Sequence, residues 1–305
     1  MNATILLACL ISAAVGAAPG EVSVVQTNEH SEIGFDKVPW LRTMTPTFDP
    51  KNSEPTYKVF THIMDFAGKE PITKGAGGKF THHRGLFIGW KDTLVGDQDY
   101  DTWHMSNSIQ KHVGWLDFIG TDGKALQQEK IDWCDLEGKT FIQEIRRISA
   151  TPAEGESRQF DFQSELTSTA ATIQLKGDLQ HAGMQVRLAQ EVAEHEDSTN
   201  YILPAGSVSG DDDKVTGAWW ACCSAEVGGK RYWVLHMTHP STCAETPVYS
   251  IRKYARFGAF WEPTLEEGKP QTYSFRVVVS ERELDVAECQ KRYDAYAASS
   301  VSMGK

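Results

Sequence analysis

The sequence predicts an all-β protein, a large antiparallel β-sandwich with one C-terminal helix. Three observations support this fold class. Short apolar or alternating segments follow one another along most of the chain, turn-forming residues separate them, and only one segment, near the C-terminus, has convincing helical spacing. Strands and turns at this density are typical of a sandwich or a barrel.

The N-terminal segment has the composition of a secretory signal peptide. Residues 5–18 are apolar or small, no charged side chain occurs before Glu21, and small residues at positions 15, 17 and 18 fit a cleavage site. We expect residues 1–18 to be removed and the protein to be exported, to the periplasm or the medium. Residues 19–305 are expected to form one β-sandwich domain, because no linker or repeat divides them. No other segment approaches the ~18 apolar residues of a membrane span.

Charge and cysteine content exclude several classes of protein. The formal net charge of −11 argues against nucleic acids and anionic membranes as partners. An exported protein can contain a disulfide, but the spacing does not specify a pairing. The absence of a CxxC motif argues against a structural zinc site. Five cysteines, an odd number, follow the signal peptide: Cys134, Cys222, Cys223, Cys243 and Cys289.

The strands are predicted from apolar runs and period-two alternation. They are the apolar run 86–90, the partly alternating segment 141–148, the alternating segments 160–166 and 273–277, and the segment 231–237, whose two faces are both apolar. Gly, Asp and Pro residues predict turns between them. These turns are expected at 121–123, 137–139 and 227–230.

The predicted helix follows residues 280–283, Ser-Glu-Arg-Glu, which match a capping box. Its apolar residues have roughly helical spacing, and we expect it to close the domain against a sheet edge; they are Leu284, Ala287, Tyr293 and Tyr296. The acidic loop 210–213 could hold calcium, but it lacks the alternating ligand spacing of an EF-hand. A solvated turn explains it better.

The most informative motif is the run His82-His83-Arg84-Gly85, which precedes the apolar strand 86–90. It places two groups that titrate near neutrality beside one permanent cation. A strand that only packs gains nothing from such side chains, because buried polar groups must be paired. Since successive strand residues face opposite ways, one of the two histidines could simply be solvated. We interpret the run as part of a functional site.

Several other segments place His or Arg beside aromatic residues, in a chain with nine Trp and nine Tyr. Aromatic rings that stack on sugars, together with planar charged groups that bind hydroxyls or carboxylates, are what a carbohydrate cleft requires. The alternative is that a large β-sandwich core simply uses many aromatic residues. The segments are 101–105, 110–115, 180–187, 236–241 and 249–254.

With these motifs the chain resembles the PmoA-like family of exported bacterial proteins. The resemblance covers residues 38–279 and rests on the set of segments 82–90, 112, 122–133, 181–187 and 239–254. Two positions depart from the family pattern: Phe80-Thr81 replaces a His-Pro pair, and Thr242 replaces an Asn. The resemblance implies a galactose-mutarotase-type supersandwich and a sugar-related role. Copper-dependent methane oxidation is not expected, because the methane-oxidising subunit of that name is a multi-helix membrane protein.

The leading hypothesis is a carbohydrate-active enzyme, a lyase, hydrolase or epimerase, that moves protons on a sugar or glycoside. His83 would be the general acid or base, and His112 and His181 are candidates for the second proton-transfer role. A small-molecule or oligosaccharide substrate would be the partner. The residues expected to bind it, the arginines through a carboxylate or oxyanion, are His82, Arg84, Arg187, His239, Arg252 and Tyr254.

Two other functions remain open. A metal-dependent oxygenase or hydrolase could use several of the ten histidines, although no HExxH motif is present. The short matches to metal-ligand spacing are 195–197, His236-x-x-His239 and His30-x-Glu32. A non-catalytic carbohydrate-binding protein is the third hypothesis, but aromatic residues and amides would meet its needs without so many titratable side chains. The sequence does not identify the sugar or a cofactor.

Overall fold

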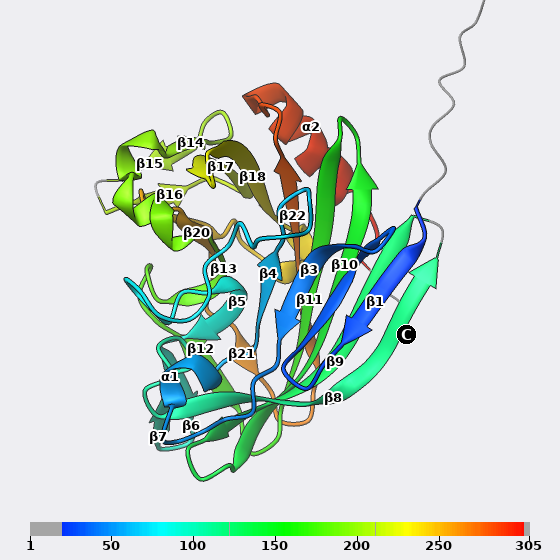
Figure 1. The fold of residues 1–305 in the computed structure, drawn as a ribbon. Helices are drawn as coiled ribbons and strands as arrows, with labels where there is room; N and C mark the ends of the chain where they lie inside the picture. Colours follow the sequence, from blue (N-terminus) through cyan, green and yellow to red (C-terminus); the bar gives the residue numbers. More distant parts are fainter. Residues whose placement is uncertain (1–19, 122, 211, 302–305) are drawn as a thin grey trace, which may run out of the picture.

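The computed structural model describes residues 20–121, 123–210 and 212–301, and within them it contains three β-sheets (Figure 1). The largest has ten strands. Their order across the sheet is β1 (Val22–Gln26), β2 (His30–Phe35), β3 (Val38–Met44), β4 (Phe60–Ile63), β5 (Gly85–Trp90), β13 (Ala182–Arg187), β20 (Arg256–Phe260), β19 (Val248–Ile251), β16 (Lys214–Thr216) and β15 (Val208–Ser209).

The second sheet has eight strands and the third has four. The eight-stranded order is β14 (Asn200–Ile202), β17 (Trp220–Val227), β18 (Lys230–Thr238), β22 (Gln271–Ser280), β11 (Ser157–Ser168), β10 (Thr140–Ala153), β9 (Lys124–Asp135) and β8 (Ser108–Thr121). The four-stranded order is β21 (Thr264–Leu265), β12 (Ile173–Lys176), β6 (Asp92–Val95) and β7 (Gln98–Tyr100). Every pair of neighbouring strands is antiparallel.

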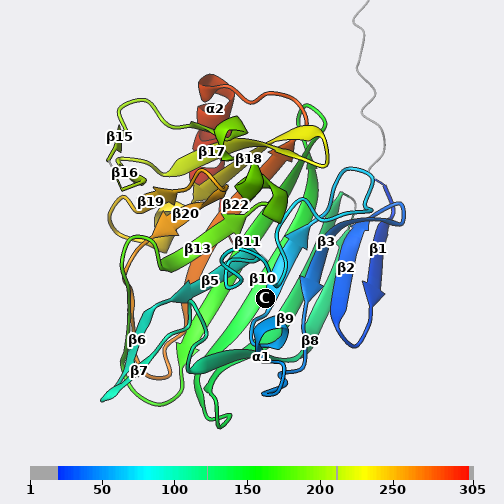
Figure 2. The ribbon, with the colours of Figure 1, turned by 60° about the vertical axis from the view of Figure 1, so that its left-hand side comes forward.

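The main core lies between the two large sheets, whose strands run over one another in Figure 2. Alternate residues of β13, namely Ala182, Met184 and Val186, point into this core. The facing sheet contributes the alternate apolar residues of β11, including Phe160 and Phe162. Because strand side chains alternate between faces, the intervening residues of β13 lie on the outer face of the ten-stranded sheet. That outer face carries the candidate site.

The all-β fold class and the expected strands are confirmed. The apolar run 86–90 lies in β5, and the other four predicted strands lie in β10, β11, β18 and β22. The turn at 137–139 joins β9 to β10, and the turn at 227–230 joins β17 to β18. Gly138 and Gly228 both have positive φ there, as glycine readily permits. Of the turn at 121–123, residue 122 is outside the described residues.

A C-terminal helix is confirmed, but the predicted start was wrong. Ser280 is the last residue of β22, and helix α2 is Val286–Ala297. Asp285 is its N-cap, with a side-chain oxygen that accepts from the backbone N–H of Glu288 at 2.8 Å. The sheet therefore extends further than the pattern at 280–283 indicated, and the stronger cap five residues later begins the helix. A short helix, α1, is Ser53–Thr56, and 3-10 turns are Gln190–Glu194, Glu196–Ser198 and Pro240–Thr242.

Helix α2 packs on the outside of the eight-stranded sheet, at the top of Figure 1. Its residues Cys289 and Tyr296 join a second apolar cluster with Cys222, Leu235 and Val278. All five cysteines of the described residues are unpaired, so no disulfide is present among them. The predicted signal peptide lies outside the described residues.

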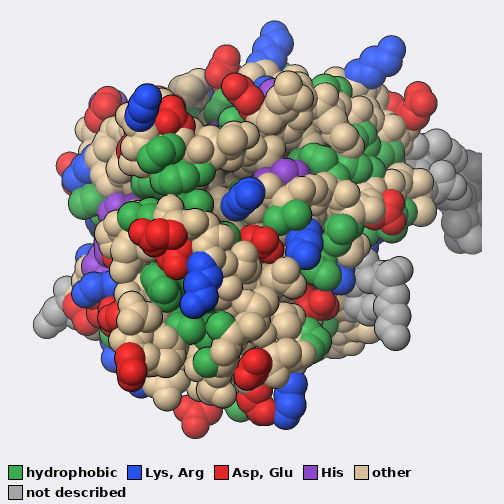
Figure 3. All heavy atoms as spheres, turned by 90° about the horizontal axis from the view of Figure 1, so that it is seen from below, with side chains coloured by type: hydrophobic (Ala, Val, Ile, Leu, Met, Phe, Trp, Pro, Cys, Tyr) green, Lys and Arg blue, Asp and Glu red, His purple; other side chains and the backbone are tan. Residues whose placement is uncertain are grey.

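Within the described ranges, no helix is long and apolar enough to span a membrane. Figure 3 shows one face of the molecule, on which acidic and basic side chains are interspersed and histidines reach the surface in several places. This face carries no extended basic stripe of the kind that binds a nucleic-acid backbone.

Candidate functional site

The candidate site lies on the outer face of the ten-stranded sheet, across three neighbouring strands. Phe87 on β5, Gln185 and Arg187 on β13, and Arg256 on β20 point to this face, since their neighbours in sequence point into the core. Strand pairing places Gln185 opposite Phe87 and Arg187 opposite Arg256. Polar and charged side chains are therefore collected on one sheet surface by simple alternation.

His83 is the most deeply buried histidine of this site, with 3% of its surface exposed. It lies in the turn before β5, where its backbone N–H donates to the carbonyl of Phe80 at 3.0 Å. Its ring is parallel to Tyr254, with 6.1 Å between ring centroids, and meets Trp103 edge-on at 5.7 Å. Neither ring nitrogen has a hydrogen-bond partner among the described residues. Such an orphaned buried polar group requires an explanation.

Four histidines form a row that ends at His83. The ring centroids are 4.2 Å apart between His83 and His82, 4.4 Å between His82 and His104, and 4.8 Å between His104 and His181. His82, His104 and His181 are half-buried, whereas His83 is buried. The row therefore leads from the protein surface to the buried imidazole.

Two members of the row are oriented by carboxylates three residues earlier in the chain. His104 Nδ1 lies 2.8 Å from Asp101 Oδ2, and His181 Nδ1 lies 2.7 Å from Asp178 Oδ1. A carboxylate only accepts hydrogen bonds, so each Nδ1 carries the proton and each Nε2 has its lone pair free. Both histidines are thereby held in a defined tautomer.

The electrostatic surroundings favour the neutral form of His82, His83 and His181. Burial, followed by the charges of Arg256, His82 and Lys58, holds the pKa of His83 well below its ordinary value. Burial and the neighbouring Lys58 lower the pKa of His82 to about 2, and burial also lowers the pKa of His181. A neutral imidazole at neutral pH can accept a proton or coordinate a ligand.

Arg187 adds a buried positive charge to the site. It has no exposed surface, and none of its three guanidinium nitrogens has a hydrogen-bond partner in the described structure. Its guanidinium carbon lies 4.8 Å from the ring centroid of Tyr254, the same ring that is parallel to His83. Burial lowers the pKa of Arg187 to about 10, so it is still charged at neutral pH. Arg187, Tyr254 and His83 therefore form one contiguous group.

The structure brings together five of the nine residues that the sequence suggested: His82, His83, His181, Arg187 and Tyr254. Trp103 links His181 to His83, because both rings meet it edge-on. The catalytic and binding roles of these residues remain predictions.

The other four predicted residues have local structural partners. Arg84 turns away from the row, donates to Glu54 at 3.0 Å and stacks on Tyr57. His112 on β8 lies 2.9 Å from the buried Glu129, in the other large sheet. Arg252 forms an ion pair with Asp213, at 2.5 Å.

His239 lies beside helix α2, where its ring nitrogens contact Ser241 and the carbonyl of Ser299. Sequence alone could not separate these four from the row, since the partner of each comes from a residue type common throughout the chain. The interaction with Arg252 also occupies Asp213 of the acidic loop 210–213, of which residue 211 is outside the described residues.

No three His, Cys, Asp or Glu side chains of the described residues are arranged to hold a metal ion. Of the short metal-spacing matches, His236 is in the core and contacts Tyr249 and Met184, whereas His30 contacts Thr27. His195 lies between two 3-10 turns.

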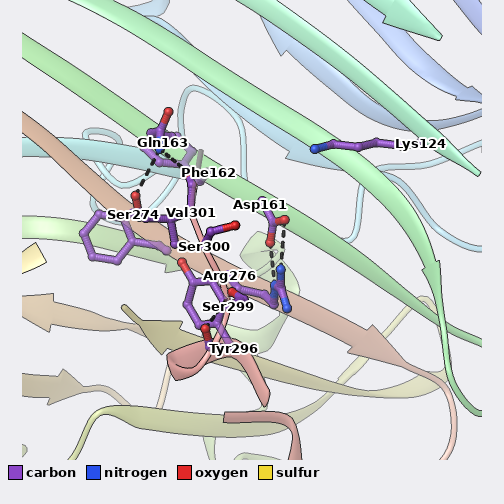
Figure 4. Close-up of a pocket in the computed structure, with 11 residues that line it drawn as sticks. Lys124, Asp161, Phe162, Gln163, Ser274, Arg276, Tyr296, Ser299, Ser300 and Val301 are labelled. Carbon is purple, nitrogen blue, oxygen red and sulfur yellow. Dashed lines mark hydrogen bonds and ion pairs between the residues drawn. The ribbon is translucent and has the colours of Figure 1, made fainter. Parts of the chain in front are cut away.

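A pocket of about 190 Å³ lies on the other large sheet, beside helix α2 (Figure 4). Two of its three charged side chains are already paired: Arg276 Nε lies 2.5 Å from Asp161, and the Arg276 guanidinium stacks on Tyr296. Gln163 donates to Ser274 and to the carbonyl of Val301. In Figure 4 these side chains point toward one another, whereas those around His83 and Arg187 have nitrogens without partners.

Sequence reasoning missed Lys58, Asp178 and Arg256, and it singled out the segment 101–105 without giving Asp101 or His104 a role. One signal was available: Asp101 and His104 have the same Asp-x-x-His spacing as Asp178 and His181. Arg256 could only be found by knowing that β20 lies beside β13.

Fold and site together define a class of protein: an antiparallel β-sandwich with a histidine and arginine site on the outer face of its larger sheet. The chain belongs to DUF6807, described as a family of unknown function, whose family model matches residues 31–294. A comparison with curated proteins gives no match.

Two solved structures resemble the chain at low identity. One is a GalM/aldose epimerase homologue from C. elegans, at 9% identity and a TM-score of 0.35, covering 87% of this chain and 99% of that one. The other is a predicted kojibiose phosphorylase from the human microbiome, at 11% identity and a TM-score of 0.32, covering 92% of this chain and 36% of that one. These likenesses are too low for the chemistry of either protein to be transferred to this chain.

Proposed function

We propose that the protein is a carbohydrate-active enzyme and that His83 transfers a proton on a sugar bound to the outer face of the ten-stranded sheet. One observation carries the proposal. A buried imidazole with both nitrogens unpartnered lies among the aromatic rings of Phe80, Trp103 and Tyr254. Aromatic faces suit the apolar face of a sugar ring, and the free nitrogen suits one of its protons.

His83 acts as the proton acceptor in the first step. Its lowered pKa means that the imidazole is neutral when the substrate arrives. The proton leaves a sugar carbon or hydroxyl and adds to a ring nitrogen, and positive charge develops on the imidazole. The adjoining row, through His82 to His104, offers further imidazoles between His83 and solvent. Lyase, hydrolase and epimerase reactions are all compatible with this step.

We propose in addition that the protein is exported and that it is related to the PmoA-like proteins. An exported protein meets extracellular or periplasmic glycosides directly. The family match to DUF6807 supports a common fold for the relatives but assigns no reaction.

The test is a product screen with purified protein. It is incubated with uronic-acid glycosides, oxidised-sugar glycosides and their neutral counterparts, and products are detected by mass. The proposal expects conversion of at least one glycoside, slowed by about 10²–10⁴-fold in His83→Ala. Depletion of free sugar without any product would instead support a non-catalytic binding protein. A stoichiometric metal in the same preparation, with conversion lost on chelation, would favour the metal-dependent alternative.

A further inference from the structure

Four buried cations lie in this part of the protein without a carboxylate within 4.0 Å, and three of them, Lys58, Arg187 and Arg256, act on His83. The side chains of Lys58, Lys74, Arg187 and Arg256 are each 3% exposed or less. Among the described residues, none of these four side chains forms an ion pair within 4.0 Å. Buried charges in folded proteins are normally paired or bound to a ligand. An excess of positive charge is therefore built into this part of the sheet.

The two arginines are also incompletely hydrogen-bonded. Arg256 Nη1 donates to Gln185 at 3.1 Å and to Ser250 at 2.9 Å, but its Nε has no partner. Arg187 has no partner at any of its three nitrogens. The lysines differ, because Lys58 donates to the carbonyl of Trp103 at 2.6 Å and Lys74 to that of Gly75 at 3.1 Å. Arg187 is the group that a ligand must satisfy.

We propose that the substrate is a sugar that bears a carboxylate, of the uronate class, and that Arg187 binds this carboxylate with Arg256 beside it. This inference rests on the proposed function and names its substrate class. Water could satisfy the hydrogen bonds of Arg187, but it would leave two buried like charges unneutralised. An anion does both, and the planar guanidinium fork matches the two oxygens of a carboxylate.

The neighbouring base favours a carboxylate over a phosphate. When the charge of a carboxylate is neutralised, the hydrogen on the adjacent carbon becomes removable. The C–H bond breaks, its electron pair is delocalised onto the carboxylate as an enediolate, and the proton adds to His83. The guanidinium groups stabilise the enediolate charge. A proton from solvent added to the opposite face of the same carbon gives the epimer, and His83 then releases its proton to solvent, which completes the balance. A phosphate gives no comparable stabilisation to a neighbouring carbanion.

The side chains of Lys79 and Phe80 lie over the ring of Tyr254, and the ligand would approach Arg187 from this side. Phe80 is 41% exposed and lies 5.0 Å from Tyr254, whose ring contacts Arg187. Lys79 pairs with Glu196 at 3.2 Å. Because both side chains are exposed, this ion pair fixes the position of Lys79 only weakly. Gly77 and Gly78, which directly precede Lys79, have positive φ and allow the backbone to change direction. Lys79 and Phe80 are therefore the side chains over Tyr254 that a ligand would displace first.

The test is calorimetric titration of the purified protein at pH 7 with methyl glucuronide, methyl glucoside and glucose 6-phosphate. We expect the glucuronide to bind the wild type and the glucoside to bind at least tenfold more weakly. Arg187→Met should weaken glucuronide binding by about 100-fold, because a buried charged partner is lost. Arg187→Lys serves as a second variant that keeps the charge but loses the fork. The matched control is Arg147→Met, which removes a buried arginine of β10 that is already paired with Glu165.

The outcomes separate the two proposals. If both glycosides bind equally well to the wild type and to Arg187→Met, the carboxylate is excluded while a sugar site at His83 stands. If glucose 6-phosphate binds more tightly than the glucuronide, the site recognises a phosphate and the proposed carboxylate substrate is wrong. If none of the three ligands binds and the product screen is also negative, the sugar function itself fails.

Discussion

Arg187 and Arg256 are direct cross-strand partners on β13 and β20, and both are buried, at 0% and 1% exposure. Like charges directly opposite each other on one sheet face destabilise a fold. Nothing in the described structure neutralises them. We attribute these two unneutralised charges to the binding of an anionic ligand. The arginine pair, with His83 beside it, is therefore the centre of our account.

Arg187→Met should therefore stabilise the free protein while it weakens glucuronide binding by about 100-fold. An unpaired buried charge carries a desolvation cost that no partner offsets, so an apolar side chain of similar length should be more stable there. Even the replacement of a buried ion pair by apolar side chains is often neutral or stabilising by about 1–4 kcal/mol. Arg146→Met is the contrasting variant, since Arg146 is equally buried but pairs with Glu144 through two 2.8 Å contacts. Breaking that pair should cost about 3–5 kcal/mol. Urea denaturation of both variants checks the difference, and a destabilised Arg187→Met would contradict the account.

His83→Ala should lower turnover on the converted glycoside by about 10²–10⁴-fold, the usual contribution of a positioned acid or base. Its melting temperature should fall somewhat, because the truncation leaves a cavity among buried aromatic rings, so turnover is compared on protein shown to be folded. Added imidazole should restore part of the turnover by entering the vacated space. A folded His83→Ala protein with full activity would remove His83 from the mechanism, and His181 would be the next base to test.

Acid should destabilise the protein through its buried neutral histidines. Burial lowers the pKa of His236 to about 3, against an unfolded value near 6.5, so the unfolded state binds more protons as the pH falls. The contribution of His236 is fully present above pH 6.5 and is lost progressively between pH 6.5 and about 3. From pH 6.5 to 5 the loss is about 2 kcal/mol. In urea denaturation at both pH values, His236→Gln should show a smaller loss than the wild type; an equal loss would assign the acid sensitivity elsewhere.

Asp285→Ala should destabilise the protein by about 1 kcal/mol, because it removes the N-cap of helix α2. Asp285→Asn keeps an oxygen that can accept from the N–H of Glu288 and should lose much less. Thermal melts of the two variants compare them directly. If the two substitutions were equally harmful, the side-chain charge rather than the cap hydrogen bond would stabilise the helix.

Period-two alternation was sufficient to predict the fold class and the strands that carry it. The segment 160–166 alternates because one of its faces meets the core, and 231–237 is apolar throughout because its far face is covered by helix α2. The helix start was misjudged, since the pattern at Ser280 resembles a cap while its backbone still belongs to β22. A local pattern cannot reveal where sheet pairing ends.

The candidate site could be predicted only in part, for a topological reason. His82 and His83 were found because they are adjacent to a strand and to each other. Arg187 was found beside aromatic residues, but its partner Arg256 comes from a strand that is 69 positions further along the chain (256 − 187) and becomes its neighbour only on folding. The same limitation explains why His112 was wrongly grouped with the site. Its partner Glu129 lies on the adjacent strand β9, and this pairing is visible only in the folded protein.

The most direct test is a crystal structure of the protein with methyl glucuronide. The account predicts the sugar against Tyr254, with its carboxylate about 2.7–2.9 Å from the Arg187 guanidinium nitrogens and the carbon next to the carboxylate facing His83. The rival position is the pocket lined by Asp161, Arg276 and Tyr296 on the other large sheet. Density for the glucuronide in that pocket, with Arg187 and His83 free of ligand, would contradict the account.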